Sequence, residues 1–182
     1  MLTYNICFVR RGSHILLLNR EHPSWMGRWN GVGGKLEPGE DPRASAVREL
    51  YEETRITGCD LSFKGFITWN VDGLKYGGMY TYLAEVPADY AYVTPIQTNE
   101  GILDWKSIDW ILHPDNQGIA TNIPPCLEKI LYEPACYNHH FIYQDGNLAG
   151  HYSELLNPMV ENDSTIRYEY LNHCRIASEY AI

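Results

Sequence analysis

The amino-acid sequence predicts a layered domain of the α/β or α+β class, because strand-like and helix-like segments follow one another along the chain. Short apolar runs bounded by turn residues indicate strands, and two stretches of helix-forming residues that begin at prolines indicate helices. Hydrophobic residues make up 45% of the 182 residues, which suits a packed core and argues against disorder. We assign residues 1–152 to the domain and residues 153–182 to a C-terminal extension of unknown role.

The first two predicted strands cover residues 4–9 and 15–18, because both runs are apolar and Gly12-Ser13 between them favours a turn. Residues 21–29 contain Pro23 and Gly27, so we expect a loop there. A dense glycine cluster follows at residues 31–34, and a second turn is expected at residues 36–40.

The first predicted helix begins at Asp41, a good N-cap residue, with Pro42 in the first helical position. Residues 43–54 contain no Gly or Pro and are rich in helix formers, and Gly58 is a suitable stop. Helical spacing places four residues on one side, which we expect to face the core: Ala44, Val47, Leu50 and Tyr51.

The remaining elements follow from similar patterns. Residues 61–70 and 79–86 are expected to be strands, with Asp72-Gly73 and Gly77-Gly78 in the connection between them. A further strand is expected at 101–106, a helix at 124–132, and a hairpin whose strands, 140–143 and 148–152, flank Asp145-Gly146-Asn147. Residues 165–180 are expected to form a last helix.

The charge and the cysteines exclude several classes of protein. The formal net charge is -9 and Lys and Arg form no basic stripe, which argues against binding of a nucleic acid polymer. No apolar run approaches the roughly 20 residues that span a bilayer, and the first residues lack the pattern of a signal peptide. The cysteines are odd in number and form no C-x-x-C pair, which favours thiols in a reducing cytoplasm: Cys7, Cys59, Cys126, Cys136 and Cys174.

Three glutamates of the first helix carry the strongest chemical signal. Glu49, Glu52 and Glu53 have i, i+3 and i+4 spacing, so their carboxylates point to one face and repel one another. Arg48 offsets part of this repulsion, and a divalent cation such as Mg²⁺ does so better. Lys35, beside the glycine cluster, could meet a phosphate as a point charge. The alternative is a solvated acidic helix face, which is common in acidic proteins.

These residues match a longer pattern, and the chain resembles the Nudix hydrolase family through it. The Nudix box is Gly, five residues, Glu, seven residues, then Arg-Glu-aliphatic-any-Glu-Glu-any-Gly-aliphatic. The matching positions are Gly34, Glu40, Arg48, Glu49, Leu50, Glu52, Glu53 and Ile56. Arg55 departs from the pattern, since the family usually has Gly there; either the helix continues towards Gly58 or Arg55 adopts a left-handed conformation.

The resemblance implies an α/β/α sandwich with a mixed central sheet, in which the box forms a loop, a helix and a loop. It implies that Glu49, Glu52 and Glu53 hold Mg²⁺ or Mn²⁺ with the carbonyl of Gly34, and that Arg48 orients a glutamate. Water would then attack a phosphorus atom of a nucleoside triphosphate and release a nucleoside monophosphate and pyrophosphate. Family members differ in which glutamate is the base, and Glu49 is our first choice.

Residues 27–35 also resemble the MutT-related oxidised-purine triphosphatases, as do Asn99-Glu100-Gly101 and the hairpin near residues 141–148. This implies that Asn30 reads the purine edge, that Arg20 lies near the substrate, and that Glu100 is an additional metal ligand or base. It also places Trp69 and Met79 in an apolar pocket. Each has a simpler alternative: a turn residue for Asn30, core residues for Trp69 and Met79, and solvated surface positions for Arg20 and Glu100.

The base specificity stays open at this point. The related animal enzyme has a Trp and paired aspartates in the segment that corresponds to residues 113–122, whereas this chain offers Asp115, Asn116 and Asn122 and no Trp. We expect hydrolysis of 8-oxo-dGTP or a related purine triphosphate, in a monomer or a homodimer. The alternatives are hydrolysis of ADP-ribose or another nucleoside diphosphate derivative, and a catalytically silent module that binds a nucleotide.

Overall fold

The structure, a computed structural model, describes residues 2–179, with side chains as far as Arg175. Its described residues form one sheet with strand order β6-β7-β2-β1-β5-β4-β8-β9, and β3 pairs with β2. The strands are β1 (Tyr4–Arg11), β2 (His14–Arg20), β3 (Trp29–Asn30), β4 (Leu61–Val71), β5 (Lys75–Glu85), β6 (Ile96–Gln97), β7 (Gly101–Ser107), β8 (Cys136–Gln144) and β9 (Asn147–Leu156). The helices are α1 (Pro42–Thr54), α2 (Ile108–Leu112), α3 (Pro124–Tyr132), the 3₁₀ helix η1 (Pro158–Glu161) and α4 (Ser164–Glu179).

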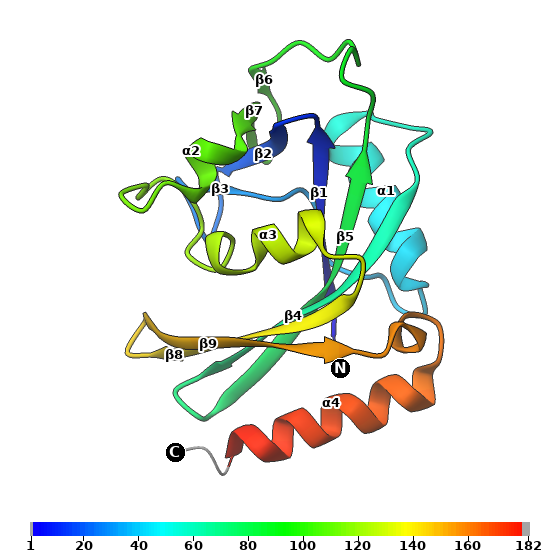
Figure 1. Cartoon of the computed structure of the whole chain (residues 1–182), viewed down its shortest axis with the longest axis vertical. Helices are drawn as coiled ribbons and strands as arrows, with labels where there is room; N and C mark the ends of the chain where they lie inside the picture. The colour runs from blue at the N-terminus through cyan, green and yellow to red at the C-terminus, as the bar shows by residue number, and fades with distance from the viewer. Residues whose placement is uncertain (1, 180–182) are drawn as a thin grey trace.

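The sheet is mixed, as expected. Strand β1 runs parallel to β5 and β4 runs parallel to β8, whereas the other pairs are antiparallel. Alternate residues of β1 point to opposite faces of the sheet. Cys7 belongs to the same buried cluster as Leu50 of α1, and Phe8 belongs to the other cluster, with Leu127 of α3. Helices α1 and α3 therefore cover opposite faces, which confirms the α/β/α sandwich (Figure 1).

Helix α1 has the predicted start but not the predicted orientation. The side chain of Asp41 accepts the backbone N–H groups of Arg43 and Ala44, as an N-cap does. Of the residues expected to face the core only Leu50 is buried; Ala44 is exposed, and Val47 and Tyr51 are 51% and 47% exposed. The buried side is instead Pro42, Ser45, Ala46, Leu50 and Thr54.

Polar contacts explain this rotation of α1. Asn5 of β1 donates from Nδ2 to Oγ of Ser45 at 2.9 Å, and the backbone N–H of Gly33 donates to Oε2 of Glu53 at 3.0 Å. Both bonds turn the small and acidic side of the helix towards β1 and the glycine cluster, a contact that hydrophobic periodicity does not register. The same rotation leaves Val47 and Tyr51 on the outer side.

Helix α1 ends at Thr54, and its C-cap is Arg55, not Gly58. Arg55 has φ 62° and ψ 10°, the left-handed conformation, and its backbone N–H donates to the carbonyl of Tyr51 at 2.8 Å. Of the two alternatives that the missing glycine of the box leaves open, the second is therefore the one observed.

The connection between β4 and β5 is shorter than predicted. Gly77 and Gly78 lie within β5 and not in the connection, which is formed by Asp72 and Gly73. Gly77 pairs with Trp69, and a Cβ atom on Gly77 would lie 2.6 Å from the indole ring. The glycine thus gives the Trp69 ring room on the strand, so it is a packing residue where the sequence suggested a turn.

The predicted strand at 101–106, the helix at 124–132 and the last hairpin are confirmed, the hairpin strands being longer than expected. Strands β3 and β6, helix α2 and η1 were not predicted, because each has five residues or fewer and no clear period. None of the helices within residues 2–179 is long and apolar enough to cross a bilayer.

The C-terminal segment packs against the domain. Strand β9 continues to Leu156, η1 follows, and α4 begins at Ser164, so the division at residue 152 stays a prediction. Ile166, Tyr170 and Leu171 of α4 pack against the buried cluster on the α1 side of the sheet. Arg43 and Glu161 join α1 to η1 through a salt bridge of 2.9 Å. Tyr180, the predicted last residue of the final helix, lies outside the described residues.

Candidate functional site

A cleft of about 1580 Å³ contains almost all of the residues that the sequence selected. Its lining combines the glycine cluster, one side of α1, the β4–β5 hairpin and the loops after β2 and before β7. The predicted residues that line it are Arg20, Asn30, Gly34, Lys35, Glu49, Glu52, Glu53, Trp69, Met79 and Glu100. Arg48 does not line the cleft, but it donates hydrogen bonds to the carboxylates of Glu49 and Glu52.

The glycine cluster holds the acidic face of α1 close to β1. The carbonyl of Gly34 accepts the N–H of Asn5 at 2.9 Å, which ties the cluster to the edge of β1. A Cβ atom on Gly34 would lie 2.5 Å from the carboxyl carbon of Glu49, so only glycine leaves this carboxylate in place. Gly33 has φ 139°, which favours glycine, and its N–H binds Glu53.

Arg48 links three carboxylates. Its Nε and Nη2 atoms donate to the two oxygens of Glu40 at 2.8 and 2.9 Å, while Nη1 donates to Glu49 at 2.9 Å and to Glu52 at 3.1 Å. The pair with Glu40 is bidentate, the strongest geometry for an arginine and a carboxylate. These hydrogen bonds from Arg48 lower the pKa of Glu40 to about 2. Arg48 thus connects the side chain of Glu49 to Glu40 and Glu52.

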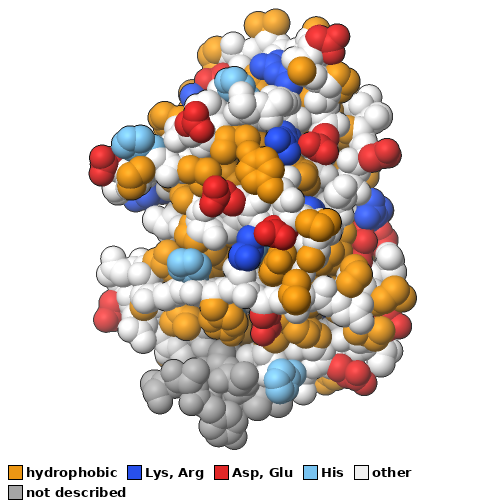
Figure 2. Space-filling view, in the orientation of Figure 1, with side chains coloured by type: hydrophobic (Ala, Val, Ile, Leu, Met, Phe, Trp, Pro, Cys, Tyr) orange, Lys and Arg blue, Asp and Glu red, His pale blue; other side chains and the backbone are white. Residues whose placement is uncertain are grey.

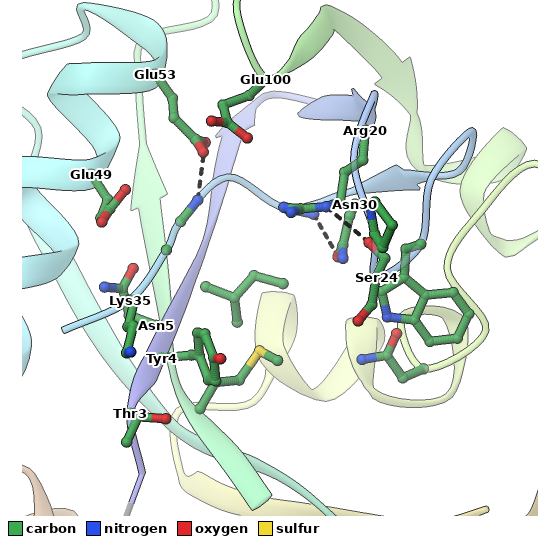
Figure 3. A pocket seen from close by; sticks show the side chains of 18 of the residues that line it. Thr3, Tyr4, Asn5, Arg20, Ser24, Asn30, Lys35, Glu49, Glu53 and Glu100 are labelled. Atoms are coloured by element: carbon green, nitrogen blue, oxygen red, sulfur yellow. Dashed lines mark hydrogen bonds between the residues drawn. The ribbon is translucent and has the colours of Figure 1, made fainter. Parts of the chain in front are cut away.

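Two carboxylates of the cleft are held where ionisation is costly. Burial raises the pKa of Glu53 to about 8, and the nearby charges of Glu49 and Glu100 add to this increase. Burial also raises the pKa of Glu49, although its hydrogen bond from Arg48 works against the increase. Figure 3 shows Glu53 and Glu100 near one another at one end of the cleft, with Glu49 on the neighbouring turn of α1. A cation between these carboxylates would offset both the cost of burying their charges and the repulsion between them.

Within the residues that the structure describes, no group of three or more His, Cys, Asp or Glu side chains converges as a metal site. Glu49 and Glu52 are turned towards Arg48, and Glu53 towards Gly33. The chemistry of the donor set nevertheless fits a hard divalent ion. It consists of carboxylate oxygens, with the pKa raised for Glu49 and Glu53, and of the Gly34 carbonyl, which keeps a second lone pair.

The other end of the cleft is apolar and aromatic. Trp69 and Met79 are both partly buried, and both pack against the buried cluster on the α3 side of the sheet. Asn30 is 8% exposed, and its Oδ1 accepts the N–H of Gly31 at 2.9 Å. Trp69 and Met79 are therefore at once core residues and cleft residues, and Asn30 is at once a turn residue and a cleft residue. A role in the core or in a turn is therefore compatible with a position in the cleft.

The charged residues beside the glutamates occupy different places. Arg20 donates from Nε to the carbonyl of Ser24 at 3.0 Å, and in Figure 3 its guanidinium lies between that loop and the carboxylates of Glu53 and Glu100. Lys35 is exposed at the rim. The carbonyl of Glu100 accepts the N–H of Glu21 at 2.9 Å, so the loop before β7 touches the loop after β2.

Sequence reasoning did not select Trp25, which lines the cleft and packs against the same cluster as Trp69. A tryptophan in an irregular loop has no periodicity that reveals which way it points. Of the three residues offered between 113 and 122, only Asn122 lines the cleft; it is 4% exposed and its Oδ1 accepts no hydrogen bond. Asp115 and Asn116 border a separate depression beside Trp110.

Two adjacent histidines of β8, His139 and His140, are buried away from the cleft. His139 and His140 are each 1% exposed, and they bind residues of different neighbouring strands: His139 pairs with Ser153 of β9 at 2.7 Å and His140 with Thr68 of β4 at 2.8 Å. Neither lines the cleft.

Comparisons with known proteins agree with this geometry. Residues 2–121 match the model of the NUDIX domain family. The oxidized purine nucleoside triphosphate hydrolase of Mus musculus is 30% identical over 157 residues, which are 82% of this chain and 92% of that protein. An uncharacterized Nudix hydrolase of Bacillus subtilis strain 168, YvcI, is 31% identical over 107 residues, or 57% of this chain; the match spans 64% of YvcI.

The fold has solved relatives as well. The crystal structure of the MutT protein from Bacillus halodurans superposes with a TM-score of 0.70 and 25% identity, over 85% of this chain and 98% of that one. A MutT Nudix hydrolase from Burkholderia pseudomallei has a TM-score of 0.55 and 20% identity over 70% of this chain and 95% of that one, a likeness in fold alone. Family match, fold and the arrangement of the box residues all agree, and the chain belongs to the Nudix family as a Nudix hydrolase.

Proposed function

We propose that this protein is a Mg²⁺-dependent pyrophosphohydrolase that converts a nucleoside triphosphate into a nucleoside monophosphate and pyrophosphate. The observation that carries the proposal is the two-ended cleft, which has carboxylates and glycine backbone at one end and Trp69, Met79 and Asn30 at the other. A nucleoside triphosphate has the same two parts, an anionic chain and a planar base with polar edges. Mn²⁺, which accepts similar oxygen ligands, is the alternative ion.

The metal would be held by Glu49, Glu52, Glu53 and the carbonyl of Gly34, with Glu100 as an additional ligand. When bound, Mg²⁺ would neutralise phosphate charge and make an attacking water more acidic. The position of Lys35 at the rim suits contact with an outer phosphate.

Among these residues, Glu49 is our choice for the general base. Burial raises its pKa, which favours acceptance of a proton, and Arg48 donates to its carboxylate at 2.9 Å. Arg48 is thereby a positioning residue, because it reaches the reaction only through Glu49 and Glu52.

The substrate that we favour is 8-oxo-dGTP or a related oxidised purine triphosphate, whose removal cleans the nucleotide pool before DNA synthesis. Support comes from the name of the mouse relative and from Asn30, since an amide can pair with a donor and an acceptor on a purine edge.

We further propose that the protein works in a reducing cytoplasm as a monomer or a homodimer. Among its five cysteines, Cys7 and Cys126 are free thiols that are each only 1% exposed. On the face that Figure 2 shows, Lys and Arg side chains lie singly among acidic ones, which supports a single nucleotide rather than a nucleic acid polymer as the partner.

A substrate panel in Mg²⁺ tests the proposal. It should contain 8-oxo-dGTP, dGTP, dATP, ADP-ribose and a dinucleoside polyphosphate, and it should score pyrophosphate separately from phosphate. We expect pyrophosphate from the triphosphates and the highest kcat/KM for the oxidised purine. Turnover of ADP-ribose alone would instead identify a hydrolase of nucleoside diphosphate derivatives. Nucleotide binding without any turnover would identify a catalytically silent module.

A further inference from the structure

The loop of residues 21–28, between β2 and β3, places one large aromatic side chain on the cleft. Trp25 is partly buried, lines the cleft and packs against the cluster that also supports Trp69 and Met79. Its neighbour Met26 is 65% exposed and is not a lining residue. The loop therefore presents Trp25 to the base end of the cleft and directs the next side chain to solvent.

The conformation of this loop is held by residues at the end of β2. The Nε atom of Arg20 donates to the carbonyl of Ser24 at 3.0 Å, and the carbonyl of Arg20 accepts the N–H of Gly27 at 2.7 Å. Asn19 donates from Nδ2 to the carbonyl of Gly27 at 3.3 Å. Trp25 itself has φ 66°, a left-handed backbone that costs a residue with a side chain free energy and persists only where surrounding contacts fix it.

Arg20 is the side chain best placed to supply that contact. Its guanidinium bond to Ser24 fixes the residue directly before Trp25, and Figure 3 shows Arg20 reaching across towards this loop while the carboxylates lie on its other side. A planar guanidinium gives this bond a fixed direction that a lysine ammonium lacks.

We infer that Trp25 stacks on the nucleotide base, beside Trp69, and that Arg20 is a positioning residue for Trp25 and not a ligand of the phosphate chain. This inference rests on the proposed function, because it names the residue that binds the base of that substrate. An aromatic ring stacks on the flat face of any base, so Trp25 contributes affinity and not a choice between oxidised and unoxidised purines. That choice belongs to groups at the base edge, such as Asn30.

The first test measures Trp25→Ala and Trp25→Phe, with Met26→Ala as the matched control in the same loop. Two affinities are measured at equilibrium: that of a purine nucleoside monophosphate and that of pyrophosphate. We expect Trp25→Ala to weaken the monophosphate roughly tenfold, Trp25→Phe to weaken it much less, and Met26→Ala to match the wild type. Pyrophosphate affinity should stay unchanged in all three. A Trp25→Ala variant that binds the monophosphate as the wild type does would overturn the inference.

The second test separates positioning from charge at Arg20. Arg20→Lys keeps the charge and loses the directed bond to Ser24, whereas Arg20→Met loses both. We expect both variants to weaken the nucleoside monophosphate, neither to weaken pyrophosphate, and the Arg20→Lys/Trp25→Ala double variant to be no weaker than Trp25→Ala alone. If Arg20→Lys behaves as the wild type and Arg20→Met loses pyrophosphate, Arg20 is a phosphate ligand and the positioning role is wrong.

Failure of the two proposals can be distinguished. Binding of the monophosphate needs no turnover, so the Trp25 variants remain decisive even if the wild type hydrolyses none of the triphosphates. Conversely, normal hydrolysis with an unchanged KM in Trp25→Ala would remove the stacking role and leave the proposed reaction intact. Oxidised and unoxidised purines should lose affinity by the same factor in Trp25→Ala; an unequal loss would contradict the claim that Trp25 does not choose between them.

Discussion

Arg48 donates from Nε and Nη2 to both carboxylate oxygens of Glu40, at 2.8 and 2.9 Å, and so fastens α1 to the turn that precedes it. The side chain of Glu40 is 16% exposed and that of Arg48 26%, so solvent weakens the pair less than it weakens a surface pair. Because a third nitrogen of the same guanidinium binds Glu49, the pair also sets the direction of a cleft carboxylate. Stability and geometry of the site should therefore depend on it together.

We predict that Glu40→Gln lowers the free energy of unfolding by about 1–2 kcal/mol, because it removes one charged, bidentate interaction. The measurement is chemical denaturation at pH 7. Glu37→Gln is the matched control, since Glu37 is exposed in the same turn. Equal stabilities for the two variants would show that the pair with Arg48 contributes nothing.

Glu53→Gln should lower kcat by roughly 100-fold or more, because the amide cannot supply the negative charge that a metal ligand needs. The fold should persist, since an amide oxygen can still accept the N–H of Gly33. Steady-state kinetics and circular dichroism measure the two effects, with Glu169→Gln on the exposed side of α4 as the control. Near-normal turnover by Glu53→Gln would rule out the metal role proposed for this residue.

Gly34→Ala should lose activity and keep most of its stability. The new methyl group would lie 2.5 Å from the carboxylate of Glu49, a flexible side chain that can move aside but then leaves its catalytic position. We expect kcat to fall roughly tenfold or more. Gly150→Ala is the control, because a Cβ atom there meets nothing within 4 Å. The idea fails if both alanine variants are equally active.

Arg55→Gly should stabilise the protein by about 1 kcal/mol, since glycine adopts the left-handed conformation without the strain that other residues bear. Arg55 has φ 62°, and its guanidinium lies 5.1 Å from the centre of the Tyr51 ring, a contact that both substitutions described here remove. Arg55→Ala keeps the Cβ atom and hence the strain, so it should show no such gain. Thermal unfolding of the three proteins provides the comparison.

Buried His139 should make the fold sensitive to acid. Burial lowers its pKa from 6.5 to about 4, so between these values the unfolded chain binds a proton that the folded chain does not. This contribution to stability is fully present above pH 6.5 and is lost as the pH falls towards 4, by about 3 kcal/mol. In His139→Gln that part of the decline should disappear, whereas substitution of the exposed His22 by Gln, whose charge does not act on His139, should leave the curve unchanged. Urea denaturation at several pH values measures both curves.

The local elements could be predicted from the sequence because their signals are local. Asp41 and Pro42 predict the start of α1, and the observed helix, Pro42–Thr54, begins there. The prediction of which side of α1 faces the core was wrong. The rotation of the helix depends on Asn5 and Gly33, which precede it in the chain and contact it only in the folded state. In the same way Gly77 suggested a turn, although its contact is with Trp69 across two strands.

The sequence alone determined the Nudix box. The spacing of Gly34, Glu40, Arg48 and the three glutamates indicates the family of the chain. Helical geometry also fixes which of these side chains share one face of α1. Only the tertiary structure decided what faces that helix across the cleft. Trp25, Trp69 and Asn122 come from distant parts of the chain and meet because β4, β8 and the loops beside them pack in one order. Such contacts depend on long-range strand pairing, whose register no short stretch of residues encodes.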